Sequence, residues 1–124
     1  MIFKVVTGAL LAVSTLGLGS AAFAHHSFAM FDTNKSVVLD GTVKDFQWTN
    51  PHSWIQLTAM DQGKSVEFSI EGGSPNLLTR KGWTRTSLKI GDQVKITVHP
   101  LKDGTHGGSF MSAVLSDGRT LAND

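Results

Sequence analysis

Cysteine is absent from the 124 residues. The chain therefore forms no disulfide and offers no thiolate nucleophile, no cysteine metal ligand and no lipoprotein attachment point. A long uninterrupted apolar run is also missing. The apolar stretch over residues 5–18 is interrupted by threonine, serine and glycine, whereas a membrane-spanning helix needs about 20 predominantly apolar residues. This stretch is therefore not expected to remain as a membrane anchor.

Acidic residues are missing from the first 24 positions, where Lys4 is the one charged side chain. A basic start, an apolar centre and the small-x-small ending Ala22-Phe23-Ala24 predict a secretory signal peptide over residues 1–24. Residues 20–22 fit the same pattern, so cleavage after Ala22 is the alternative to cleavage after Ala24. The mature protein is expected to be periplasmic or secreted, with no stable membrane insertion.

Excess charge of either sign is absent from the mature chain. Cleavage after Ala24 leaves 124 − 24 = 100 residues, enough for one domain. Loss of Lys4 leaves 11 − 1 = 10 basic side chains against 10 acidic ones. A neutral domain has no electrostatic footprint for a polyanion, so nucleic acid is not an expected partner.

The hydrophobic pattern of the mature chain is typical of β-structure. Over residues 36–49, alternate residues from Val37 to Val43 share one face, whereas Phe46 and Trp48 have the opposite parity. This switch predicts a bulge or bend in a long first strand, and Gly41 makes bending easier. A turn signal at residues 50–51 precedes a second strand over residues 52–60, and residues 64–70 predict a third.

The pattern then changes to a short helix over residues 74–82. Ser74 suits the N-cap, Pro75 the first helical position and Gly82 the C-cap, and Trp83 is expected to close over the core. A fourth strand is predicted around residues 94–98, then a polar, glycine-rich loop over residues 99–108 and a fifth strand over residues 109–116. Residues 119–121 are expected to add a last short pairing.

The predicted order β-β-β-α-β-β, mainly β with one helix, is that of the five-stranded oligonucleotide/oligosaccharide-binding (OB) Greek-key barrel. We assign this OB-like domain to residues 36–121, preceded by an N-terminal arm over residues 25–35 that packs its aromatic residues onto the domain. A small open β-sandwich of similar strand content is the alternative.

Several short motifs occur together along the chain. Taken as a set, they resemble a family of small exported bacterial proteins classed as a domain of unknown function. The resemblance implies an exported single β-barrel-like domain and assigns no activity. The motifs are His25-His26-Ser27-Phe28 with Phe31-Asp32, Asn50-Pro51-His52, Glu71-Gly72-Gly73-Ser74-Pro75-Asn76, Lys81-Gly82-Trp83, and Gly91-Asp92 with His99-Pro100-Leu101.

Histidines suggest a metal site. Cleavage after Ala24 makes His25 the first residue, so its amine and imidazole can chelate one metal ion together. A second imidazole would complete a three-nitrogen site of the histidine-brace kind, which favours Cu(II). Asp32 could add an oxygen ligand. Cleavage after Ala22 would instead create a Phe-Ala-His terminus, which also binds Cu(II). The candidate metal ligands are His25, His26, His52, His99 and His106.

The second strand offers an alternative soft-donor face. His52, Trp54 and Met60 share parity and Trp48 lies nearby, a set that could hold Cu(I) with a cation–π contact. The simpler interpretation, which we favour, is that Trp and Met fill the barrel and His52 caps the Asn-Pro turn.

Motifs of known enzymes are absent. The sequence has no nucleophile elbow, phosphate-binding loop or zinc-hydrolase helix motif. Glu67 and Glu71 lie about 13 Å apart along the predicted strand, more than the carboxyl separations of glycosidases. These residues are expected to be solvated or ion-paired, although Glu71, beside two glycines, could mark a ligand-facing rim.

The sequence thus predicts a non-enzymatic exported binding module, in its most specific form a copper-binding protein that uses the N-terminal histidine and a domain histidine. The alternative is a structural or accessory envelope protein that docks on a protein partner through the aromatic arm, with incidental histidines. Oxidative copper chemistry at a brace-like terminus is the one enzymatic role considered.

Overall fold

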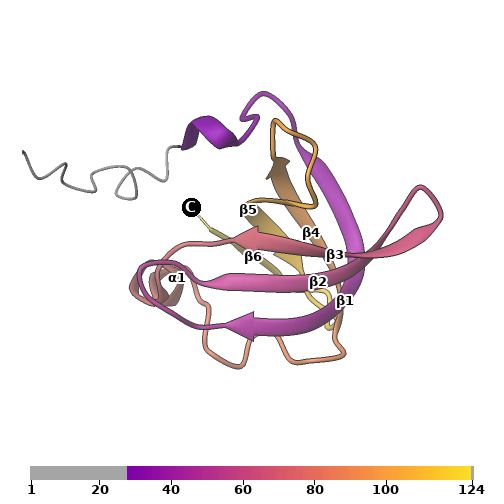
Figure 1. Ribbon diagram of the computed structural model, residues 1–124. Helices are drawn as coiled ribbons and strands as arrows, with labels where there is room; N and C mark the ends of the chain where they lie inside the picture. The colour runs from indigo at the N-terminus through magenta and orange to yellow at the C-terminus, as the bar shows by residue number, and fades with distance from the viewer. Residues whose placement is uncertain (1–27, 124) are drawn as a thin grey trace, which may run out of the picture.

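A computed structural model describes residues 28–123, which form a closed β-barrel of five strands with one short α-helix (Figure 1). The elements follow the predicted order. They are η2 (Phe28–Met30, a 3-10 helix), β1 (Val37–Gln47), β2 (Trp54–Asp61), β3 (Lys64–Glu71), α1 (Pro75–Arg80), β4 (Gln93–Pro100), β5 (Gly107–Val114) and β6 (Thr120–Ala122).

The barrel closes through one parallel pairing. The sheet order is β3-β2-β1-β4-β5-β6, with antiparallel neighbours, and residues 69–71 of β3 pair in parallel with residues 107–109 of β5. Strands β1 to β5 therefore form the ring, and β6 adds to β5. This connectivity, with α1 between β3 and β4, confirms the OB-like prediction and excludes the open sandwich.

The long strand β1 serves both sides of the barrel. Its register against β2 shifts between Val43 and Asp45, which confirms the predicted bulge. Gly41 pairs with Ala59 of β2 and with Val94 of β4. A side chain at Gly41 would stand 2.4 Å from the backbone oxygen of Thr58, so this close approach requires glycine.

The barrel interior is apolar. The most deeply buried large side chains include Leu57, Ile70 and Ile96, and Trp83 closes the core as predicted, with 1% of its surface exposed. The indole Nε1–H of Trp83 donates to the backbone oxygen of Ala122 at 2.8 Å, which ties the C-terminal strand to the core. No helix within residues 28–123 has the length and apolar character needed to cross a membrane.

The helix α1 is shorter than predicted. Ser74 caps its N-terminus by accepting a hydrogen bond from the Leu77 amide at 3.2 Å, as expected. The helix ends at Arg80, so the C-cap is Lys81, and Gly82 follows with a φ of 94°. The predicted C-cap at Gly82 is therefore wrong by one residue, because the glycine occupies the left-handed position just beyond the cap.

The predicted loop over residues 99–108 was also too long. β4 continues to Pro100 and β5 begins at Gly107. At Gly107 and Gly108 a side chain would stand 2.6 Å from the Ser69 oxygen and 2.7 Å from the His99 oxygen, respectively. These glycines therefore allow close strand contact, whereas the sequence pattern suggested a flexible loop.

Candidate functional site

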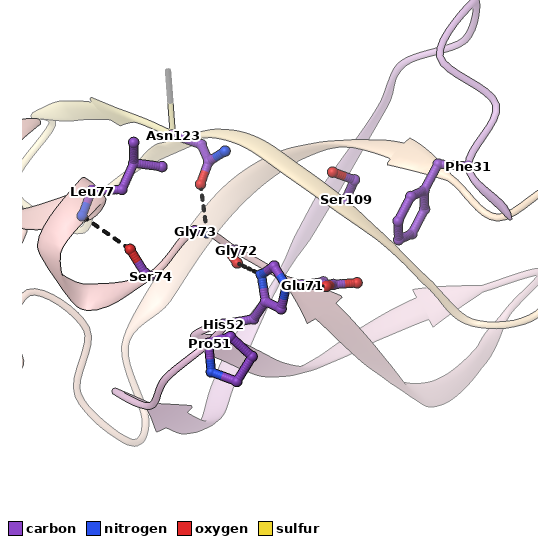
Figure 2. Close-up of a pocket in the computed structure, with 10 residues that line it drawn as sticks. All are labelled: Phe31, Pro51, His52, Glu71, Gly72, Gly73, Ser74, Leu77, Ser109 and Asn123. Atoms are coloured by element: carbon purple, nitrogen blue, oxygen red, sulfur yellow. Dashed lines mark hydrogen bonds and ion pairs between the residues drawn. The ribbon is translucent and has the colours of Figure 1, made fainter. Parts of the chain in front are cut away.

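The candidate site is a pocket of about 370 Å³ on the outside of the barrel (Figure 2). The β1–β2 connection, the end of β3, the start of α1, the arm before β1 and the segment after β6 meet there. His52 and Glu71 are the ionisable side chains among its ten lining residues. The lining residues are Phe31, Pro51, His52, Glu71, Gly72, Gly73, Ser74, Leu77, Ser109 and Asn123.

Backbone pairing between the β1–β2 connection and the end of β3 fixes the floor of this pocket. The amide of Ser53 donates to the Gly73 oxygen at 2.9 Å, and the amide of Gly72 donates to the Ser53 oxygen at 2.8 Å. The Gly73 amide in turn donates to Oδ1 of Asn123 at 2.8 Å. The Asn50-Pro51 peptide bond just before His52 is cis. His52 is thus held beside Glu71 by main-chain hydrogen bonds from both segments.

The two ionisable groups of the pocket face one another. Nε2 of His52 lies 3.5 Å from Oε1 of Glu71, and the side chains are 37% and 13% exposed, respectively. The other ring nitrogen, Nδ1, lies 3.2 Å from the Gly72 oxygen. A carbonyl oxygen accepts only, so Nδ1 carries the hydrogen and donates it.

This arrangement permits two states of the pair. If the imidazole carries a second proton, Nε2–H donates to the Glu71 carboxylate as an ion pair. If the imidazole is neutral, the Nε2 lone pair and a carboxylate oxygen converge, and a cation or a metal ion can lie between them. A metal-binding histidine typically donates its other ring N–H to a backbone carbonyl or a carboxylate, as Nδ1 of His52 does here.

The N-terminal arm supplies one wall of the pocket. Phe31 forms an isolated antiparallel bridge with Leu101, and the Asp32 amide donates to the Pro100 oxygen at 2.8 Å. Phe31 is 7% exposed and stands across the pocket from His52 (Figure 2). This burial confirms, for Phe31, that the arm packs aromatic side chains onto the domain. Phe31 is thus not a free docking residue.

His99 borders a neighbouring hollow of about 240 Å³ that shares Phe31, Ser109 and Asn123 with the main pocket. Its Nδ1 donates to the Lys35 oxygen at 2.8 Å, so the ring fastens the arm to β4. His99 pairs with Ser109, which pairs with Glu71 across the parallel seam. His99 therefore lies two strands away from the His52–Glu71 pair.

His106 belongs to a different part of the surface. Its Nε2 lies 2.8 Å from Oδ2 of Asp61, and its ring meets Phe68 edge-on at 5.1 Å. These contacts join the β4–β5 loop to the β2–β3 hairpin. In the same loop, hydrogen bonds from the Thr105 hydroxyl and amide lower the pKa of Asp103 below its usual value.

The structure thus does not gather the three domain histidines. His25 and His26, the other two candidates, lie outside the described residues. Within residues 28–123 no three metal-binding side chains form a cluster. His52 and Glu71 are therefore two adjacent ligands that would need further ligands from elsewhere.

The proposed soft-donor face is not assembled either. Met60 is 64% exposed and lies on β2 about 26 Å from His52 at 3.3 Å per residue. Trp48 instead packs edge-on against Phe46, with ring centroids 5.7 Å apart. The expectation that Met60 fills the barrel is also wrong, because its parity places it on the outer surface. The His52 ring bonds Gly72 rather than capping the turn.

Glu67 and Glu71 lie in different environments, as their sequence positions suggest. Glu67 forms an ion pair with Lys44 on the barrel surface, as expected, whereas Glu71 is largely buried at the pocket rim. Sequence reasoning missed Ser109 and Asn123 as lining residues, because only the parallel seam and the chain end bring them here. Glu71 beside Gly72-Gly73 was the signal that pointed to this rim.

Comparison with known proteins places the chain in one family. Residues 12–110 match the family described as "Family of unknown function (DUF6152)". The matched stretch includes the pocket residues Phe31, His52, Glu71 and Ser109. No curated protein and no solved structure matches the chain. The match covers most of the sequence, and the protein therefore belongs to the DUF6152 family of unknown function.

Proposed function

We propose that the mature protein is an exported, non-enzymatic binding module that holds a copper ion between its processed N-terminus and the His52–Glu71 pair. The observation that carries the proposal is the pair itself. One nitrogen and one carboxylate oxygen converge at 3.5 Å in a surface pocket, and the other ring nitrogen of His52 already donates to a backbone carbonyl.

The separation of the two atoms suits a shared metal ion. Ligand nitrogen and oxygen atoms lie about 2 Å from a first-row metal ion, so adjacent ligands stand about 3 Å apart. A small side-chain rotation would bring Nε2 of His52 and Oε1 of Glu71 from 3.5 Å to that distance. Imidazole and amine nitrogens favour copper over magnesium or calcium.

Chain length allows the N-terminus to supply the remaining ligands. Phe31 lines the pocket, and His25 precedes it by six residues. Six residues span up to about 20 Å when extended. The terminal amine and the imidazole of His25 could therefore reach the pocket and complete a site with three nitrogens and one oxygen. His99 is the next candidate, because its hollow adjoins the pocket.

A competitive titration tests the proposal. Intact mass first identifies the processed N-terminus, and Cu(II) is then titrated against a chelator with the parent, His52→Ala and His106→Ala proteins. His106 is a matched control, because it is also a half-exposed histidine beside a carboxylate. We expect His52→Ala to lose tenfold or more in affinity, about 1.4 kcal/mol, and His106→Ala to match the parent.

Other outcomes separate the alternatives. If both variants match the parent and a synthetic N-terminal peptide binds equally well, the copper site belongs to the peptide alone. The accessory role, with docking on an envelope protein, would then be the better proposal. Docking through Phe31 would require this side chain to leave the pocket wall. A test of that role should therefore truncate the arm before Phe31.

A further inference from the structure

The neutral charge of the domain conceals a strong separation of charge. Between Gly72 and Gly91 the chain carries four basic residues and no acidic residue. The rest of the described chain carries six basic and nine acidic residues, a net charge of 6 − 9 = −3. We call these four side chains, together with Ile90, the basic face. The basic residues are Arg80, Lys81, Arg85 and Lys89.

The basic face lies at the end of α1 and along the connection from α1 to β4. Figure 1 shows this connection on the side of the barrel away from η2 and the N-terminal arm. All four basic residues are exposed, and none of them takes part in the ion pairs found within residues 28–123. Lys89 lines a shallow hollow together with Asp92 and Asp117, and Asp117 is already paired with Arg119.

Ile90 directly follows Lys89, the last basic residue of this segment. It is 77% exposed, more than any other large hydrophobic side chain among residues 28–123. Its neighbours fix it there. The buried Leu88 anchors one side of the turn, and the Gly91 amide donates to the Val43 oxygen at 2.8 Å on the other. The Asp92 carboxylate accepts the Lys89 amide at 3.0 Å, which closes the turn.

We infer that the basic face docks on an anionic phospholipid surface. Cationic side chains stay at the level of the lipid headgroups, and an exposed apolar side chain beside them can enter the acyl boundary. A nucleic acid would satisfy the charges but would offer its phosphate backbone, and no apolar surface, to the exposed Ile90. The net negative remainder of the domain would orient the basic face toward the membrane.

This inference is independent of the copper proposal, because the basic face contains none of the pocket residues. It would place the protein on a membrane surface with the basic face in contact with the lipid headgroups.

The test is flotation of the mature protein with vesicles of phosphatidylcholine alone or of equal parts phosphatidylcholine and phosphatidylglycerol. One variant changes Arg80→Gln, Lys81→Gln, Arg85→Gln and Lys89→Gln. The control variant changes Lys35→Gln, Lys64→Gln, Lys95→Gln and Lys102→Gln, which are also exposed. Both variants lose four positive charges, so their net charge is identical. Thermal unfolding shows that each is folded.

We expect the parent to bind the anionic vesicles and not the neutral ones, and to dissociate from the anionic vesicles at high salt. Each basic residue near such a surface is worth about a fivefold gain in binding. The basic-face variant should therefore bind at least about 100-fold more weakly, and Ile90→Ser should also bind more weakly than the parent. The inference is overturned if the parent does not bind, if neutral vesicles bind equally well, or if the control variant loses as much as the basic-face variant.

Discussion

Gly41→Ala should destabilise the barrel, although the substitution adds a single methyl group. That group would stand 2.4 Å from the Thr58 oxygen and 3.0 Å from side-chain atoms of Leu57 and Ala59. The nearest obstacle is backbone in the centre of β2, where Gly41 also pairs with β4. The strands must therefore move apart at the junction of the two halves of the barrel.

The magnitude follows from two opposing effects. Overpacking of this kind costs about 1–3 kcal/mol, whereas replacing glycine lowers the entropy of the unfolded chain and returns about 0.4–1 kcal/mol. The net loss is about 1–2 kcal/mol. For a domain of about this size each kcal/mol lowers the melting temperature by about 4–8 °C, so we expect a fall of roughly 5–15 °C.

Gly72→Ala is the matched control. A side chain there would meet the Ser53 oxygen at 3.5 Å, an ordinary contact distance, and its φ is not in the left-handed region. Thermal unfolding should show this variant at or slightly above the parent melting temperature. The reasoning is refuted if Gly41→Ala melts with the parent, or if the two variants fall by the same amount.

Two further substitutions test the packing around the site. Trp83→Phe should lower the free energy of unfolding by about 2–3 kcal/mol, because it leaves a void and removes the bond to the Ala122 oxygen; urea unfolding measures this, and a change below about 0.5 kcal/mol would contradict it. Ser53→Ala should leave stability unchanged or raise it by up to about 1 kcal/mol, because Oγ of Ser53 is buried without a hydrogen-bond partner. A clear loss in the same urea experiment would show that the hydroxyl is bonded in solution.

The fold could be predicted because its local signals agree with its tertiary structure. The parity switch after Val43 marks the bulge, Ser74 and Pro75 mark the helix start, and Trp83 fills the core. Each of these depends on a few neighbouring residues. The loop predicted over residues 99–108 is too long because glycine occurs in two settings. It is common in flexible loops, and it is also required where two strands approach closely, as at Gly107 and Gly108.

The site was less predictable because it depends on long-range pairing. His52 and Glu71 could each be noted from the sequence, but their contact depends on the register between β2 and β3 and on the paired backbones of Ser53 and Gly73. Ser109 arrives through the parallel seam and Asn123 through the chain end. Met60 and His52 are an even number of residues apart, so the sequence predicts that they share a face of the strand. It does not place them close together, because their positions are eight residues apart along the extended chain.

The most direct test of the account is electron paramagnetic resonance of the Cu(II)-loaded, naturally processed protein and of its His52→Ala variant. With His25 at the N-terminus, the account predicts three bound nitrogens in the parent, from the amine, the His25 imidazole and the His52 imidazole. The variant should show two, with a changed spectrum. Identical spectra from parent and variant would contradict the account, because they would show that the folded domain contributes no imidazole from His52.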